Sequence, residues 1–323
     1  MRAAVYERFG GPEVVSVKEV ATPEPGGGEV RVRVMATTVS AADHRMRAKD
    51  LPRGLGLLAS FVMGGKAPRK PILGMDFAGV IDKLGDGVSG WSVGQRVAGL
   101  TAAAFGGHGE YVCLKADGPM VPLPDTISFT DGVSVVFGGH TVSACLKAVT
   151  ITPGDKVLVN GAAGAVGTMA VQIAAQMGAE VTAVTSARNS ELARDLGASQ
   201  VIDYAVTDFA GGEAVYDVIF ECVGNAPYSR VKRVLKPGGT LLLVIADLPQ
   251  MLSASWQGAS SGHKVKVISG APGAADVALE IDLLAQGKIR PVIDTVLPLD
   301  EIGAAHRLVD TGRKRGAVVV TLD

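Results

Sequence analysis

The sequence has few cysteines, no excess of charge of either sign and no long apolar run, and each shortage excludes a class of protein. The three cysteines, Cys113, Cys145 and Cys222, are odd in number and far apart, which favours reduced thiols over a disulfide framework. The 31 basic and 32 acidic residues nearly cancel, so the charge favours neither nucleic acid nor an anionic membrane as a partner. No window approaches the roughly 18 consecutive apolar residues of a membrane-spanning helix, so a soluble protein is expected.

The first residues are typical of a strand and not of an export signal. Residues 1–7 alternate in polarity and lack the basic, apolar and small-residue segments of a secretion signal. We therefore expect a cytoplasmic protein. Its 323 residues are too many for one comfortable core and suit two domains.

Up to about residue 120, short runs rich in β-branched residues alternate with Gly, Pro and Asp. We expect strands at residues 14–20, 29–35, 77–84, 95–98 and 110–114. This part of the chain is predicted to form a small all-β domain.

From about residue 156 the pattern changes to apolar strands that alternate with helices. Strands are expected at residues 156–160, 180–185, 200–203, 216–222, 240–245 and 264–268, with helices at 168–177, 190–196 and 230–235. Repeated strand–helix units imply right-handed crossovers and a parallel sheet covered on both faces. Six such strands indicate a doubly wound, dinucleotide-binding α/β fold. The tail adds helices at 274–286 and 302–311 and a strand at 317–322 that is expected to return to the first domain.

A glycine-rich turn follows the first of these strands. It reads Gly161-Ala162-Ala163-Gly164-Ala165-Val166-Gly167, with Ala162 where the usual G-x-G-x-x-G pattern has its first glycine. A side chain at Gly164 would keep the backbone away from a pyrophosphate, and one at Gly167 would hold the helix off the strand. The exposed amides at the helix N-terminus attract the anion, so the turn predicts dinucleotide binding.

The end of the second parallel strand predicts which dinucleotide is bound. An NAD site usually has Asp or Glu there, but no acid precedes Glu191 in this chain. Ser186 and Arg188 instead offer a hydroxyl and a guanidinium to a 2′-phosphate, and a charged hydrogen bond contributes about 1.5–3 kcal/mol. NADPH is therefore the expected cofactor. The alternative is that Arg188 is only a solvated residue before a helix.

Taken together, these motifs resemble the zinc-independent quinone oxidoreductase branch of the medium-chain dehydrogenases/reductases, which includes ζ-crystallin-like and enoyl-reducing members. The matching stretches, spread over nearly the whole chain, are residues 71–80, 93–97, 109–112, 161–167, 196–198, 201–204, 216–220, 223–225 and 235–239. The resemblance implies a GroES-like catalytic domain of residues 1–123 and 272–323 and a Rossmann-like NADPH domain of residues 124–271. It also implies a cleft between them for nicotinamide and substrate.

The resemblance also assigns individual residues. Around the cofactor it implies Tyr204 beside the 2′-phosphate and, near the nicotinamide and its ribose, Thr141, Val223, Asn225, Ile245 and Ala246. Family members commonly carry Val-Asn-x-x-Asp where this chain has Val39-Ser40-Ala41-Ala42-Asp43, so Ser40 replaces an Asn that faces the substrate. Its hydroxyl could donate to a substrate oxygen. His140 is a second candidate proton donor, although a lone histidine is more often a bystander.

No catalytic metal is expected. By the local motifs, the protein ligands of zinc-using relatives correspond here to Ser40, Met75 and Phe137, and none of these side chains suits zinc. The cysteine-rich structural lobe of those relatives is also missing. Asp43, Asp76 and His44 could in principle recruit a metal, but the two Asp side chains more often stabilise such a region by hydrogen bonding.

Three functions remain open at this point. The first is metal-free transfer of hydride from NADPH to a small apolar electrophile, either a quinone or an α,β-unsaturated carbonyl compound. The second is reduction of a simple aldehyde or ketone, and the third is NADPH binding without turnover. Two structural questions accompany them: residues 51–65 form either a lid or a short packed helix, and the edge strand at 264–268 is predicted to pair two subunits into a homodimer.

Overall fold

The computed structural model describes residues 1–56, 60, 63–268 and 273–322. The chain divides into two compact units: unit 1 is Met1–Leu51, Gly56–His140 and Ala271–Asp323, and unit 2 is Pro52–Leu55 and Thr141–Gly270. The sequence placed the first boundary at residue 123, whereas the chain passes from unit 1 to unit 2 after His140, inside a helix. The second predicted boundary, at residues 271 and 272, lies outside the described residues. No helix within the described ranges is long and apolar enough to cross a bilayer.

Unit 2 is built on a six-stranded, all-parallel sheet of order β10-β9-β8-β11-β12-β13. Its strands are β8 (Lys156–Asn160), β9 (Glu180–Thr185), β10 (Gln200–Asp203), β11 (Tyr216–Glu221), β12 (Leu235–Leu243) and β13 (Lys264–Val267). Because the order runs outward in both directions from the β8–β11 pair, the switch point of the sheet lies there. Ligands of such sheets bind outside the carboxyl ends of the strands at that point.

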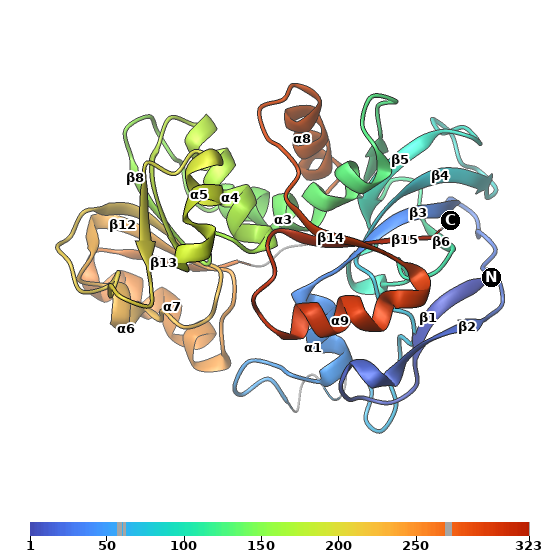
Figure 1. The fold of residues 1–323 in the computed structure, drawn as a ribbon, viewed down its shortest axis with the longest axis horizontal. Coiled ribbons are helices and arrows are strands. Elements are labelled where there is room, and N and C mark those ends of the chain that lie inside the picture. Colours follow the sequence, from blue (N-terminus) through green and yellow to red (C-terminus); the bar gives the residue numbers. More distant parts are fainter. Residues whose placement is uncertain (57–59, 61–62, 269–272, 323) are drawn as a thin grey trace. The chain divides into compact units, whose positions relative to one another are not determined.

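Helices cover both faces of this sheet. Figure 1 shows α4 (Ala165–Gln176) and α5 (Ser190–Asp195) on one face and α6 (Tyr228–Val231) and α7 (Leu248–Ser261) on the other. The strands between them are apolar on both sides: Leu158, Ile219 and Leu241 are in register on one face and Val159, Phe220 and Leu242 on the other, and all six are completely buried. This two-sided burial explains the continuous apolar runs of the sequence.

One element of unit 2 was predicted wrongly and another was not predicted. The expected helix at residues 230–235 is wrong, because α6 ends at Val231 and Leu235 already begins β12, where it pairs with Tyr216. Helix α7 was missed, although Asp247 and Gln250 form a capping box at its start.

Unit 1 contains a seven-stranded sheet and a separate antiparallel pair, β1 (Arg2–Tyr6) with β2 (Val15–Glu19). The large sheet runs β14-β15-β3-β4-β5-β7, with β6 also paired to β3. Its strands are β3 (Glu29–Val39), β4 (Asp76–Leu84), β5 (Arg96–Leu100), β6 (Tyr111–Lys115), β7 (Met120–Pro122), β14 (Ile293–Pro298) and β15 (Ala317–Thr321). Because β15 pairs antiparallel with β3, the predicted return of the last strand to the first domain is confirmed.

The part up to residue 120, which was predicted to be all-β, also contains the helix α1 (Ala41–Ala48). Unit 1 further includes the first part of α3 (Phe129–Leu146) and the two helices predicted in the tail, α8 (Ala274–Ala285) and α9 (Ile302–Asp310). Helix α9 buries Ile302, Ala305 and Val309 in the same core cluster as Val318 and Val320 of β15. Figure 1 shows α1 beside α9. Residues 57–59 and 61–62 lie outside the described residues, so the predicted lid or helix at 51–65 stays open.

Candidate functional site

The turn after β8 has the backbone geometry of a phosphate loop. Gly161 takes a φ of +83°, a left-handed conformation that favours glycine. The N–H groups of Gly161 and Ala162 both donate to the carbonyl of Val184 on β9, at 3.1 Å. At Gly167 a Cβ atom would overlap the carbonyl oxygen of Gly161, so only glycine lets the first turn of α4 lie against the loop.

Gly164, the N-cap of α4, is glycine for a different reason. A Cβ atom there would meet nothing nearer than the Gly161 carbonyl oxygen at 3.6 Å, so packing within the chain does not require glycine. The missing side chain does leave the first-turn amides of α4 open to an approaching anion. The residues of this cradle therefore fit a dinucleotide pyrophosphate.

The ends of β9 and β10 bring two of the predicted 2′-phosphate residues together. Asp203 of β10 is in register with Thr185 of β9, so Ser186 and Tyr204 follow at neighbouring positions. The Tyr204 amide donates to the Thr185 carbonyl at 3.2 Å, and the Tyr204 side chain is 61% exposed. Both hydroxyls thus lie at the carboxyl edge of the sheet.

Arg188 lies just beyond these residues, exposed in a short 3-10 helix, Ala187–Asn189. The buried Asn189 amide donates to the Ser186 hydroxyl at 3.2 Å and so holds it in place. One carboxylate that the sequence argument did not weigh is nearby: Asp203 accepts the Ala205 amide at 3.0 Å. The carboxyl ends of β9 and β10 therefore combine an exposed cation, two hydroxyls and one carboxylate that is engaged in a turn.

A buried polar pair at the switch point was missed by the sequence analysis. Asn160 ends β8 and Glu221 ends β11, the two residues are in register, and the Asn160 amide donates to Glu221 Oε1 at 2.9 Å and to Asn225 Oδ1 at 2.8 Å. Glu221 also accepts the amides of Val223 and Gly224. Burial raises the pKa of Glu221 above its ordinary value. The pair fixes the loop that carries the predicted residues Val223 and Asn225.

This loop lies against two other candidate segments. A Cβ atom on Gly161 would lie 2.7 Å from Val223 Cγ2, and one on Gly224 would lie 3.2 Å from Ile245 Cγ2. The structure therefore gathers the phosphate loop, the Val223–Asn225 loop and the Ile245–Ala246 segment at one edge of the sheet.

Thr141 is placed only indirectly. It lies one helical turn before Cys145 on α3. Burial raises the pKa of the Cys222 thiol, and the nearby Cys145 raises it further. Thr141 therefore shares a helix face with a residue that lies near Cys222, the residue before the Val223–Asn225 loop. Its role beside nicotinamide stays a prediction.

Ser40 and Asp43, the two predicted catalytic residues of the Val39–Asp43 motif, form the capping box of α1. The Ser40 hydroxyl donates to Asp43 Oδ2 at 2.7 Å, and Asp43 Oδ1 accepts the Gly74 amide at 2.8 Å. Both side chains are buried. In this arrangement the Ser40 proton is already used within the chain, and Asp43 matches the alternative of a structural, hydrogen-bonded carboxylate.

Asp76 is a second structural carboxylate. It accepts the Thr38 amide at 2.8 Å and the Thr38 hydroxyl at 2.6 Å, and it is completely buried. Burial outweighs these hydrogen bonds and raises its pKa to about 7.

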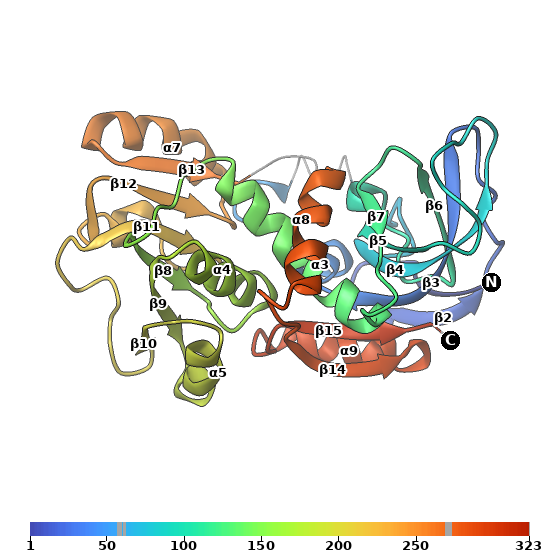
Figure 2. The ribbon, with the colours of Figure 1, turned by 90° about the horizontal axis from the view of Figure 1, so that it is seen from above.

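His140 lies on α3 beside the acidic face of α8. Its Nδ1 is 3.9 Å from Asp276 Oδ2, and both side chains are largely buried. Figure 2 shows α8 alongside α3, and Gly139 allows this approach because a Cβ atom there would overlap Glu280. Asp276 was not predicted, since it is far from His140 in sequence. A carboxylate at this distance stabilises a protonated imidazole.

The three positions that correspond to zinc ligands do not offer a zinc-binding set. Ser40 is committed to Asp43, Met75 has only a thioether, and Phe137 has no donor atom. No group of three His, Cys, Asp or Glu side chains in the described part of the chain could hold a metal ion. Zinc independence stays a prediction.

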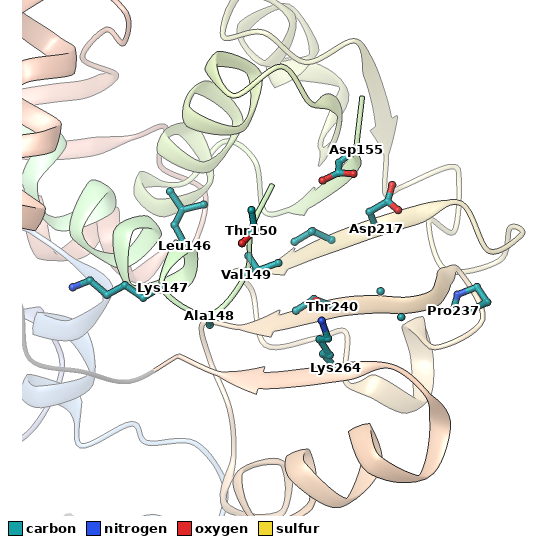
Figure 3. A pocket seen from close by; sticks show the side chains of 13 residues that line it. Leu146, Lys147, Ala148, Val149, Thr150, Asp155, Asp217, Pro237, Thr240 and Lys264 are labelled. Carbon is teal, nitrogen blue, oxygen red and sulfur yellow. The ribbon is translucent and has the colours of Figure 1, made fainter. Parts of the chain in front are cut away.

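The pocket in Figure 3 lies at the opposite edge of the sheet from the phosphate loop. It has a volume of about 470 Å³ and includes Asp155, Asp217 and Lys264, at the amino ends of β8, β11 and β13, and Thr240 of β12, which is in register with Lys264. Because the strands are parallel, this edge is the wrong one for the dinucleotide. The pocket is therefore separate from the candidate site.

Comparisons with known proteins cover both parts of the chain. Residues 26–125 match the alcohol dehydrogenase GroES-like domain, and residues 196–320 match a family described as zinc-binding dehydrogenase. A quinone oxidoreductase from Rattus norvegicus is 28% identical, with 100% of this chain and 98% of that protein covered. A zinc-type alcohol dehydrogenase-like protein from Schizosaccharomyces pombe is also 28% identical, over 99% of this chain and 96% of its own.

Solved structures agree on the fold. The quinone oxidoreductase from Coxiella burnetii superimposes with a TM-score of 0.88 at 26% identity and covers 100% of this chain and 99% of its own. The predicted combination of a GroES-like domain with a Rossmann-like parallel sheet is thereby confirmed.

Proposed function

The chain belongs to the medium-chain dehydrogenases/reductases, in their quinone oxidoreductase-like group, and we propose that it transfers hydride from NADPH to a quinone or an α,β-unsaturated carbonyl compound. The relatives support an oxidoreductase of the quinone oxidoreductase type. The choice of NADPH and the acceptor are our own extensions of that result.

The observation that carries the choice of NADPH is the composition of the sheet edge after β9. Ser186 and Tyr204 lie side by side there, and Arg188 follows within one turn. No acidic side chain ends β9, and the one carboxylate nearby, Asp203, is engaged with a backbone amide. A 2′-phosphate would meet donors at this edge, whereas the ribose hydroxyl of NADH would find no carboxylate at the end of β9 to accept its hydrogen bond.

The residues of the chain have separate tasks in this proposal. The amides after Gly164 hold the pyrophosphate, and the Asn160–Glu221 pair keeps the Val223–Asn225 loop in position. When bound, NADPH supplies the hydride. An acceptor that is already conjugated needs no Lewis acid. This agrees with Ser40, Met75 and Phe137, which do not form a zinc-binding set at the positions that correspond to zinc ligands. The remaining requirement is a proton for the developing enolate, and His140, supported by Asp276, is the candidate donor.

Stopped-flow oxidation of NADPH tests the proposal directly. The purified protein is mixed with NADPH and, in turn, a quinone, an enone and a simple alkanal, and the same series is repeated with NADH. We expect the largest kcat/KM for NADPH with the quinone or the enone. Preference for the alkanal would favour the second function, an alcohol dehydrogenase-type reductase. If NADPH binds but is never consumed, the protein binds the nucleotide without turnover.

We also propose a homodimer formed through β13. This strand is the last of its sheet, pairing with β12 alone among the described strands, and its sequence Lys264–Val267 alternates exposed and more buried residues. An open edge of this kind is a ready template for a second copy.

A further inference from the structure

Several buried side chains of unit 1 carry polar atoms that have no hydrogen-bond partner within the described part of the chain, and three of them lie close together. They are Arg47, at Nε and Nη1, His108, at Nδ1, and His306, at both ring nitrogens. All three side chains are 0% exposed. Buried donors and acceptors are nearly always satisfied in folded proteins, so this concentration needs an explanation.

Contacts between α1 and α9 place Arg47 beside His306. Arg47 Nη2 donates to both carboxylate oxygens of Asp310, each at 2.6 Å. Asp310 is four residues after His306 on α9, so the two side chains share one helix face. Arg47 is therefore held against the face of α9 that carries His306.

His108 packs against His306 on the other side of the cluster. The rings of His108 and His306 meet edge to face, with centroids 5.8 Å apart. A Cβ atom on Gly74 would lie 2.6 Å from His108 Cδ2, and the Gly74 amide donates to Asp43. Asp43 is four residues before Arg47 on α1, which completes a ring of side chains. We call Asp43, Arg47, Asp310, His306 and His108 the Arg47–His306 ring.

The unsatisfied atoms of the ring are both donors and acceptors. Burial, together with His108 and Arg47, lowers the pKa of His306 to about 2, so its ring is neutral and offers one N–H and one bare nitrogen. His108 Nε2 lies 3.0 Å from the Thr38 carbonyl and must donate to it, so Nδ1 is the His108 atom left without a partner in the described part of the chain. Arg47 offers only donors.

This mixture decides what the ring can bind. A metal ion requires acceptors only and would lie beside the Arg47 guanidinium. An anion requires donors only and would face the carboxylates of Asp43 and Asp310. A water molecule both donates and accepts, and it commonly makes about three hydrogen bonds to buried polar groups.

We propose that the Arg47–His306 ring encloses a binding site for ordered water, which bridges the Arg47 guanidinium to the imidazoles of His306 and His108. The water fastens α1 to α9 and to the segment between β5 and β6 that carries His108. Since α1 begins at the Ser40–Asp43 capping box, the site also sets the position of that motif. It is distinct from the nucleotide site and does not depend on the proposed function.

Crystals of the whole protein test the occupant directly. One native crystal is measured at high resolution, a second is soaked in bromide and a third in zinc, both with anomalous data. We expect at least one water peak about 2.7–3.2 Å from Arg47 Nη1 or Nε and from a His306 nitrogen, with no anomalous peak at that place. An anomalous bromide or zinc peak inside the ring, or a ring closed on itself without density, overturns the proposal.

A measurement in solution provides a second test. Magnetic relaxation dispersion of water counts molecules that stay bound longer than the protein tumbles. We expect His306→Phe to lose at least one such molecule relative to the wild type, while the control His263→Phe, in the other unit, loses none. An unchanged count in His306→Phe, with its fold verified by circular dichroism, contradicts the proposal. If His306→Phe does not fold, the native crystals decide alone.

Discussion

The Asn160 side chain donates a hydrogen bond of 2.9 Å to the buried carboxylate of Glu221, and the two residues are neighbours in register at the carboxyl ends of β8 and β11. Glu221 also receives the amides of Val223 and Gly224, so a single carboxylate shapes the loop beside Gly161. The relationship links the phosphate loop to the loop that is proposed to contact the nicotinamide ribose.

Replacing Glu221 with Gln should weaken nucleotide binding and stability together. The amide nitrogen of Gln cannot accept the 2.7 Å hydrogen bond that Glu221 Oε2 receives from the Gly224 amide, which would keep only its 3.0 Å bond to Oε1, at a cost of about 1–3 kcal/mol. We expect urea unfolding to show that loss and fluorescence titration to show NADPH affinity reduced by about tenfold. The control is Glu213→Gln, an exposed acid of the same unit. Equal NADPH affinity in both variants would mean that the Val223–Asn225 loop does not contact the nucleotide.

Arg188→Glu tests the choice between the two nucleotides. A carboxylate at this position repels a 2′-phosphate and removes the charged donor, so NADPH affinity should fall about ten- to a hundredfold while NADH affinity changes little. The matched control is Arg194→Glu, an exposed residue on α5. Isothermal titration of both nucleotides against the three proteins provides the comparison. A parallel loss for NADH and NADPH, or none for either, would contradict the assignment of Arg188.

The proton-donor role of His140 predicts a split between binding and turnover. His140→Gln should lower kcat for an enone by about 10²–10⁴-fold while the Kd for NADPH stays within a factor of two. Asp276→Asn should cause a smaller loss and should move the alkaline limb of the pH profile of kcat to lower pH, because the carboxylate stabilises the imidazolium. Asp282→Asn, an exposed acid on α8, is the control. Unchanged kcat and pH profiles in His140→Gln and Asp276→Asn would exclude His140 as the proton donor.

The homodimer proposal can be tested at one backbone position. The Ile268 amide donates to Leu243 on β12, and successive amides of a strand point to opposite sides, so the Val267 amide points away from β12. Val267→Pro therefore removes an outward donor and keeps the pairing with β12. Light scattering should give about twice the chain mass of 33.1 kDa for the wild type and for the control Val267→Thr, and the chain mass for Val267→Pro. A monomeric wild type at micromolar concentration would refute the proposal.

Local pattern was enough to predict the parallel sheet. Strands β8, β9 and β10 have the bounds that the apolar runs indicated, because strands buried on both faces leave a continuous signal in the sequence. The helix expected at residues 230–235 is wrong because strand pairing between distant residues outweighs the local sequence pattern there. Leu235 pairs with Tyr216 in the sheet, and no local pattern reveals that contact.

In the candidate site, too, local features could be predicted from the sequence and contacts between distant residues could not. The glycines of the phosphate loop could be found because their spacing follows from local chain geometry, whereas the Asn160–Glu221 pair depends on the register of strands 61 residues apart. The sequence analysis considered Ser40 only as a donor to a substrate oxygen. It did not recognise that Ser40 and Asp43, three residues apart, encode a capping box. The Arg47–His306 ring joins three segments of unit 1 and has no signature in the sequence.

Two buried groups of unit 1 have pKa shifts of opposite sign, so their effects on the pH dependence of stability should cancel in the wild type. His306, facing His108, Arg47 and His44, has its pKa lowered from 6.5 to about 2, so between these values only the unfolded chain binds its proton and stability rises with pH. Asp76, facing Thr37, Thr38 and Asp43, has its pKa raised from 3.8 to about 7, so only the folded chain holds its proton and stability falls as pH rises. Each slope is about 1.4 kcal/mol per pH unit, and their windows overlap between the Asp and His reference values.

Between pH 4 and 6.5, the contributions of these two groups to the free energy of unfolding in urea should therefore nearly cancel in the wild type. The single variants should separate the two contributions. In His306→Phe the Asp76 contribution remains, so stability should decrease with rising pH. In Asp76→Asn the His306 contribution remains, so stability should increase with rising pH, and the double variant should be flat again. The difference between the two single variants cancels the titrating groups whose pKa neither substitution changes, since both variants contain them. Parallel curves for the two variants would show that His306 and Asp76 do not have opposite shifts, and the burial of at least one of them would have to be reconsidered.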